Sequence, residues 1–221
     1  FTWDTAVATK GGVLIDLNDK FRKIEGDANT IGTSHTFTVS DLTPCTEYVY
    51  KIRAVIDART EDGVKNSFHT SGCIGQANIN GTAKEDIAVA GGTVSLPNKL
   101  TLSVPADAVG EENHFQINQL DRDTALGVIG TPQDLSPITG LYELSAHSDP
   151  TTKTSSFNNP ISVELSYTPS DDTDLASLVV GRYDGAWQEL SDCTVNTSTQ
   201  TISCTTTEFS VIGGFVAGAS T

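Results

Sequence analysis

The residues with the widest chemical repertoire in this sequence are four histidines: His35, His69, His114 and His147. The strand pattern places each on a different strand or loop, and none has a second titratable residue at the spacing of a catalytic or metal-binding motif. The chain holds no G-x-S-x-G, H-E-x-x-H or phosphate-loop sequence. We therefore interpret the histidines as structural or surface residues and expect no catalytic residues, no cofactor and no enzyme activity. A hydrolase triad that assembles only in space is the remaining alternative.

Two acidic clusters have the oxygen atoms that a calcium ion requires. Asp121 and Asp123 flank an arginine, and Asp171, Asp172 and Asp174 lie within a second acidic segment. Ca²⁺ takes roughly six to eight oxygen ligands, and neither cluster follows the spacing of an EF-hand loop. We interpret both as solvated acidic loops and expect no metal, with a calcium site at Asp171, Asp172 and Asp174 as the alternative.

Two segments match the N-x-[ST] acceptor sequence for N-linked glycans. One begins at Asn80, in an expected linker, and the other at Asn196, at an expected hairpin tip. Both positions are expected to be accessible, so Asn80 and Asn196 are candidate glycosylation sites if the source glycosylates its exported proteins. Threonine-rich tracts at residues 151–154 and 205–207 are candidates for O-glycosylation, although threonine is also a good strand former.

The four cysteines form two pairs along the chain. Cys45 and Cys73 bracket one predicted hairpin, and Cys193 and Cys204 bracket another. Opposite residues of antiparallel strands have Cα atoms roughly 4.5–5.5 Å apart, which a disulfide can bridge. A zinc site is the disfavoured alternative, because there is no C-x-x-C and no histidine at ligand spacing. Two disulfides predict an oxidising compartment, and therefore a secreted or cell-surface protein.

Charge and hydropathy exclude two classes of partner. The 221 residues include 28 acidic and 13 basic side chains, for a formal net charge of −15. Nucleic acid requires a Lys/Arg-rich face, which so few scattered cations do not supply. No segment approaches the roughly 18 consecutive apolar residues of a membrane span, so we expect a soluble chain without membrane insertion. The sequence starts at Phe1 and not at methionine, which predicts a mature product or an excised fragment.

The elements that must position these residues are β-strands. Short alternating segments rich in Val, Ile, Thr, Tyr and Phe recur along the chain with turn residues between them, and helical periodicity is nearly absent. The length favours two domains. We therefore predict an all-β protein of two tandem antiparallel β-sandwich domains, at residues 1–74 and 86–221, joined by a linker at residues 75–85 whose Gly, Asn and small polar residues lack periodicity.

Several segments of the first predicted domain match a known family. Phe1-Thr2-Trp3 looks like a B strand with its core tryptophan, residues 34–39 look like strand E, residues 41–48 (DLTPCTEY) match an L-x-P-x-T-x-Y turn into strand F, and residues 66–70 look like strand G. Together they resemble a fibronectin type III domain. The resemblance implies that Tyr48 bonds its hydroxyl back to the preceding loop, as in a tyrosine corner, and that Trp3 lies in the core. It also implies that strand A is missing.

The second predicted domain carries a looser resemblance. Its segments are residues 91–97 (GGTVSLP), 100–109 (LTLSVPADAV), 157–165 (FNNPISVEL), 183–187 (YDGAW) and 207–210 (TEFS). They resemble the ZU-type β-domain of ankyrins, netrin receptors, zonula occludens proteins and bacterial surface proteins. Members of that family usually have histidine where Glu208 stands. Both resemblances imply structural, adhesive or ligand-binding work.

The missing strand A has two explanations. The chain could be a fragment, or another segment could fill the vacant edge, because an unpaired strand edge is a template for β-augmentation. The apolar C-terminal run is a candidate donor for a neighbouring subunit, through Val211, Ile212, Phe215 and Val216.

Three function classes follow. The favoured one is a non-enzymatic extracellular structural or adhesive component of a cell surface or filament, which binds protein partners including copies of itself. A ligand-binding accessory module of a larger exported enzyme is the alternative, and an enzyme in its own right is the third. Only Trp3 and Trp187 are tryptophans, and both are expected to pack inside, so no planar aromatic row for carbohydrate is evident.

Overall fold

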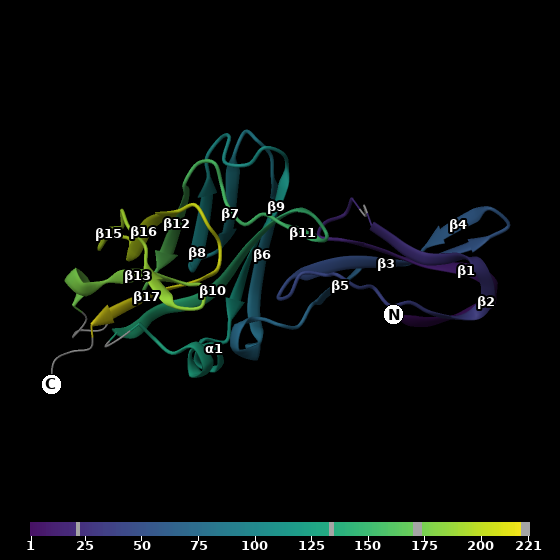
Figure 1. The fold of residues 1–221 in the computed structure, drawn as a ribbon, viewed down its shortest axis with the longest axis horizontal. Coiled ribbons are helices and arrows are strands. Elements are labelled where there is room, and N and C mark those ends of the chain that lie inside the picture. Colours follow the sequence, from purple (N-terminus) through teal and green to yellow (C-terminus); the bar gives the residue numbers. More distant parts are fainter. Residues whose placement is uncertain (21–22, 133–134, 170–173, 218–221) are drawn as a thin grey trace. The chain divides into compact units, whose positions relative to one another are not determined.

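The computed structural model describes residues 1–20, 23–132, 135–169 and 174–217. In these residues the protein is all-β, with three antiparallel sheets and one short α-helix (Figure 1). The predicted fold class is confirmed. The chain divides into two compact units, one of Phe1–Thr70 with Asp149–Thr152 and one of Ser71–Ser148 with Lys153–Thr221. No helix within the described ranges has the length and apolar character to cross a membrane.

The first unit is one antiparallel sheet in the order β2-β1-β3-β4, with β5 pairing β3 as well. Its strands are β1 (Thr2–Asp16), β2 (Lys23–Thr36), β3 (Glu47–Ile56), β4 (Arg59–Asp62) and β5 (Asn66–His69). Asp57 and Ala58 have φ of 47° and 66° between β3 and β4, as a tight hairpin turn requires.

Strand β1 is irregular along its length. Its register against β2 shifts between Asp4 and Thr9 and again after Lys10. A Cβ on Gly11 would lie 2.7 Å from Cζ2 of Trp3, so the indole ring covers Gly11 of its own strand. In a straight strand these residues would be about 26 Å apart, so the irregularity between Asp4 and Thr9 must shorten β1. This close approach explains why position 11 is glycine.

A small core fills the first unit. Ile15, Leu17 and Tyr48 are fully buried, and Val39, Leu42 and Phe68 pack against them. The ring of Phe1 adds contacts to Tyr50 and Phe68, at centroid distances of 4.8 and 5.7 Å.

The second unit contains two sheets with a shared core. One sheet has the order β14-β13-β17-β10-β9-β6, with β11 on β10, and the other has the order β15-β16-β12-β8-β7. The strands of the first are β6 (Ile79–Ile87), β9 (Asn113–Leu120), β10 (Leu135–Asp149), β11 (Thr152–Lys153), β13 (Val179–Tyr183), β14 (Trp187–Glu189) and β17 (Val211–Ala217). Those of the second are β7 (Gly92–Leu96), β8 (Leu100–Val104), β12 (Ile161–Ser166), β15 (Thr194–Asn196) and β16 (Thr201–Thr206).

Alternation along the strands creates this core. In β12 the residues Ile161, Val163 and Leu165 are fully buried, while the residues between them are more exposed. Phe115 and Ile117 of β9 are buried in the same cluster, so the two sheets face each other across it. The second unit is therefore a β-sandwich.

Helix α1 (Arg122–Ile129), which follows β9, was not predicted. Asp121 caps it, because the carboxylate accepts a hydrogen bond from the Thr124 N–H at 3.0 Å. The helix has only eight residues, too few for a helical period to stand out in the sequence, and only Ala125 is buried. The acidic cluster of Asp121 and Asp123 thus belongs to a helix start and not to a loop.

The segment expected to be a linker lies largely within the second unit's sheet. Residues 75–85 include the end of a 3₁₀ turn (Ile74–Gln76) and most of β6. Strand β6 pairs with β9 along nearly its whole length. Small and polar residues suit this strand because it lies at the edge of the sheet.

The candidate strand donor lies in an interior strand. Val211, Ile212, Phe215 and Val216 belong to β17, which pairs with β10 on one side and β13 on the other. All four are at most 9% exposed. The donor hypothesis for this segment is therefore wrong for the folded chain, since β17 has no free edge. Its apolar character reflects burial on both faces.

Candidate functional site

An open strand edge is the most distinctive feature of the first unit. Strand β3 pairs only with residues Lys10 to Asp16 of β1, so the earlier part of β1 has a neighbour only on its β2 side in the described chain. Phe1 and Phe37 exchange both backbone hydrogen bonds, at 2.8 Å each. Hydrogen-bonded pairs alternate along an antiparallel ladder, so Trp3 also faces β2, while the N–H and C=O of Thr2 and Asp4 point to the open edge.

Side chains behind this edge hold it in place. Trp3 stacks on His35 and Phe37, at centroid distances of 4.9 and 5.4 Å. The imidazole Nε2 of His35 lies 3.1 Å from the Thr9 hydroxyl, and His35 is 6% exposed. His35 is therefore a structural histidine, as predicted. Thr2 and Asp4 are exposed, and Val7 further along the strand is 55% exposed.

Tyr48 forms the predicted tyrosine corner. Its hydroxyl accepts a hydrogen bond from the Thr43 N–H at 3.0 Å and donates one to the Pro150 carbonyl at 2.7 Å. Tyr48 is fully buried, and this burial raises the pKa of its hydroxyl, while the Thr43 bond opposes the shift. The sequence predicted the bond to the preceding loop but not the one to Pro150, since that residue is distant in the sequence.

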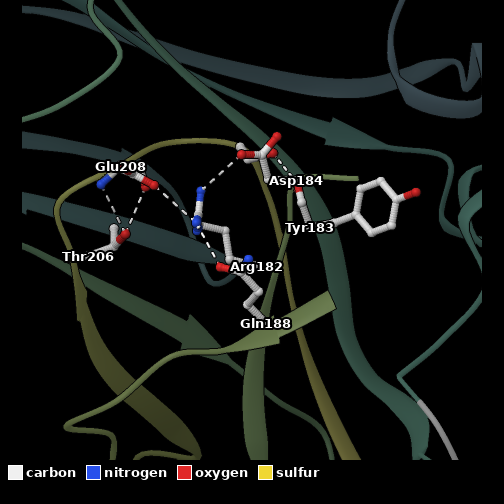
Figure 2. A network of polar contacts seen from close by, with 7 residues as sticks. Arg182, Tyr183, Asp184, Gln188, Thr206 and Glu208 are labelled. Atoms are coloured by element: carbon white, nitrogen blue, oxygen red, sulfur yellow. Dashed lines mark hydrogen bonds and ion pairs between the residues drawn. The ribbon is translucent and has the colours of Figure 1, made fainter. Parts of the chain in front are cut away.

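A polar recess in the second unit surrounds Arg182 of β13 (Figure 2). We call it the Arg182 recess; it has a volume of about 370 Å³. Arg182 Nη2 donates to Gln188 Oε1 and to Glu208 Oε2, both at 3.0 Å, and Asp184 lies 3.9 Å from Nη1. Thr206 Oγ1 donates to the Glu208 carbonyl at 2.7 Å and accepts from its N–H at 3.2 Å.

This network holds the connection between β16 and β17 against the hairpin of β13 and β14. The guanidinium is 11% exposed and already faces two carboxylates, so an anionic ligand would have to displace Glu208 or Asp184. We interpret Arg182 as a structural clamp. Glu208 thus has a local role, because its carboxylate supplies the charge that pairs with Arg182.

A second recess, of about 400 Å³, lies at the Asn113 end of β9. Its polar lining consists of Glu111, Asn113, Ser148, Thr154, Ser156 and Asn158. Thr154 Oγ1 donates to Asn113 Oδ1, and Asn113 Nδ2 donates to the Glu111 carbonyl at 3.2 Å. Neither recess is lined by a histidine or a cysteine.

The other histidines have partners that motif spacing did not reveal. His114 Nδ1 lies 2.7 Å from Asp86 Oδ1, and His147 is directly opposite His114 in the pairing of β9 with β10. His114 and His147 are buried, whereas His69 is exposed on β5. Motif spacing did not reveal the Asp86 neighbour of His114, because strand register and not sequence spacing brings these side chains together.

All four cysteines are in disulfides. Cys193 and Cys204 form one bond, with Cα atoms 4.1 Å apart, and Cys45 and Cys73 are the remaining two oxidised residues. The predicted disulfides are confirmed. The disfavoured zinc alternative requires thiolates, which oxidised cysteines do not offer. Burial raises the pKa of Glu143, which accepts a hydrogen bond from the Ile74 N–H at 3.4 Å.

The calcium candidates are only partly described. Asp171 and Asp172 lie outside the described residues. Asp174 caps a 3₁₀ turn (Leu175–Ser177), because its carboxylate accepts from the Ala176 N–H at 3.0 Å. This local role accounts for Asp174 without an ion.

The two glycosylation candidates are in different surroundings. Asn80 lies in β6, at an irregularity in its pairing with β9, and Asn196 ends the edge strand β15. Both side chains are exposed.

Trp187 is half-buried on the outer side of β13 and β17. It contacts Tyr183 and Phe215 at centroid distances of 5.4 and 4.8 Å, and its Nε1 donates to the Gly130 carbonyl at 3.0 Å. Trp187 was expected to pack inside, whereas the structure leaves its ring half-buried against Phe215. The hydrogen bond shows that the ring also fixes the end of α1. No protein-family model matches this chain, and no characterised protein has significant sequence similarity to it.

Proposed function

We propose that this protein is a non-enzymatic structural or adhesive component of an extracellular surface, and that copies of it associate through the open edge of β1. The first unit would be a fibronectin type III-like module without strand A, and the second a ZU-like module. Two disulfides suggest an oxidising environment and support this location.

The observation that carries the proposal is the orientation of Thr2 and Asp4. Their backbone groups point away from β2, and β3 does not reach them. Such unpaired N–H and C=O groups are a ready template for another strand.

A second copy of the chain fits this edge by symmetry. An antiparallel pair around a two-fold axis places Thr2 opposite Asp4 of the second copy, and Trp3 opposite its own equivalent. No like charges face each other in this register.

Sedimentation of the purified, oxidised chain over a range of concentrations tests the proposal. Asp4→Pro removes one outward N–H and is compatible with an edge strand, whereas Asp4→Ala keeps that N–H and removes the charge. We expect the wild type and Asp4→Ala to associate and Asp4→Pro to remain monomeric. Association should strengthen with salt, because each copy carries a charge of −15. A wild-type chain that stays monomeric at high concentration and high salt contradicts the proposal.

A further inference from the structure

The hairpin of β15 and β16 presents a short exposed turn at one edge of the second unit. Strand β15 is the edge strand of its sheet, and it pairs with β16 from Thr194 to Asn196. The disulfide of Cys193 and Cys204 closes the base of the hairpin. Residues 196–200 are all exposed.

Asn196 is held in a defined orientation at this turn. Its Oδ1 accepts hydrogen bonds from the N–H groups of Ser198 and Thr199, at 3.0 and 3.2 Å. Two backbone donors fix which end of the side-chain amide is the oxygen. Nδ2 therefore lies on the other side, and within the described chain neither Nδ2 nor the Ser198 hydroxyl has a hydrogen-bond partner. The two groups that define this N-x-[ST] sequence are both accessible.

Asn80 is in the opposite situation. The pKa of the Asp121 carboxyl is lowered mainly by its hydrogen bonds from Thr124 and to a smaller extent by the side-chain amide of Asn80. The hydroxyl of Thr82, the third residue of the acceptor sequence, donates to Asn118 Oδ1 at 2.9 Å. The hydroxyl that this acceptor sequence requires is thus engaged within the sheet of β6 and β9.

We infer that Asn196, and not Asn80, accepts an N-linked glycan in the folded protein. The co-substrate is an oligosaccharide on a polyprenyl diphosphate. Asn196 Nδ2 forms a bond to the anomeric carbon and loses a proton to a base of the transferase, while the anomeric C–O bond breaks and the polyprenyl diphosphate leaves with the electron pair.

A glycan at this position would also cover an edge strand. The outer backbone groups of β15 have no paired strand in the described chain. A bulky, hydrated group at Asn196 would hinder the addition of another strand to this sheet. Association would then be restricted to other edges, although the glycan assignment does not depend on the association proposed above.

The test uses the full, oxidised chain with a purified oligosaccharyltransferase that reads N-x-[ST] and its lipid-linked oligosaccharide. The readouts are intact mass and peptide mapping. We expect one glycan on the folded wild type, its loss in Asn196→Gln and Ser198→Ala, and its retention in Asn80→Gln. The reduced, unfolded chain is the matched control and should be modified at both sites.

Two outcomes would overturn the assignment. One is modification of Asn80 in the folded chain, which would mean that the hydrogen bond of Thr82 to Asn118 does not protect it. The other is an unmodified folded chain when the unfolded control is modified, which would mean that the hairpin geometry excludes the transferase.

Discussion

Replacing Tyr48 by phenylalanine tests whether the tyrosine corner stabilises the first unit. The substitution keeps the ring, which stacks on Phe68 at 5.9 Å, and removes only the hydroxyl. Two partners lose their bond, the Thr43 N–H and the Pro150 carbonyl. An unsatisfied buried polar group costs about 1–3 kcal/mol, and Thr43 is only half-buried, so we expect a loss of about 2–4 kcal/mol in the free energy of unfolding.

Tyr50→Phe is the matched control. Tyr50 lies two residues further along β3, is half-buried, and contacts Phe1 and Phe68 through its ring. Its hydroxyl has no hydrogen bond in the described chain. The control should therefore change the free energy of unfolding by about 0.5 kcal/mol or less.

Urea unfolding followed by tryptophan fluorescence is the assay. The chain has two tryptophans, so a Trp187→Phe background leaves Trp3 as the only reporter, and Trp3 lies in the first unit. Disulfides are kept intact. If Tyr48→Phe and Tyr50→Phe shift the transition equally, the two hydrogen bonds of the corner do not stabilise the unit and the reasoning fails.

Two further predictions concern the second unit. Burial raises the pKa of Tyr142 from 10.0 to about 12, so its contribution to stability is complete below pH 10 and is lost as the pH rises toward 12. Tyr142→Phe should weaken the alkaline loss of stability, as measured by circular dichroism; identical profiles would contradict this. For the clamp, Arg182→Ala and Glu208→Ala should couple by about 0.5–1.5 kcal/mol in a double-mutant cycle, because Glu208 is 52% exposed and Arg182 only 11%. Strictly additive effects would mean that the ion pair does not contribute to the free energy of unfolding.

Local patterns were sufficient to predict the strands and the disulfides. Side chains on a strand alternate between two faces, so segments such as Ile161–Ser166 can be recognised from a few residues. The cysteines could be paired because each pair brackets a hairpin, and residues on neighbouring strands are near each other both in sequence and in space. Helix α1 was not predicted because eight residues are too few to establish a helical period among the surrounding strands.

The candidate sites depended on pairing between distant strands. His114, Asp86 and His147 come together through the register of β6, β9 and β10. Arg182 meets Glu208 because β13 pairs with β17, the strand that follows this glutamate. The separation of these residues along the chain does not predict that they are in contact, because the register of the strands depends on which faces are buried in the assembled sheet.

The sequence by itself therefore determined the all-β class, the oxidised cysteines and the tyrosine corner, because each of these features depends on the pattern of residues within a short part of the chain. Tertiary structure alone decided that the C-terminal apolar run is an interior strand, that the irregularity in β1 brings the Trp3 ring over Gly11, and that the outward edge of β1 is open. The physical reason is that an apolar strand has the same local pattern whether it is an interior strand or a free donor, and only the neighbours it pairs with distinguish the two.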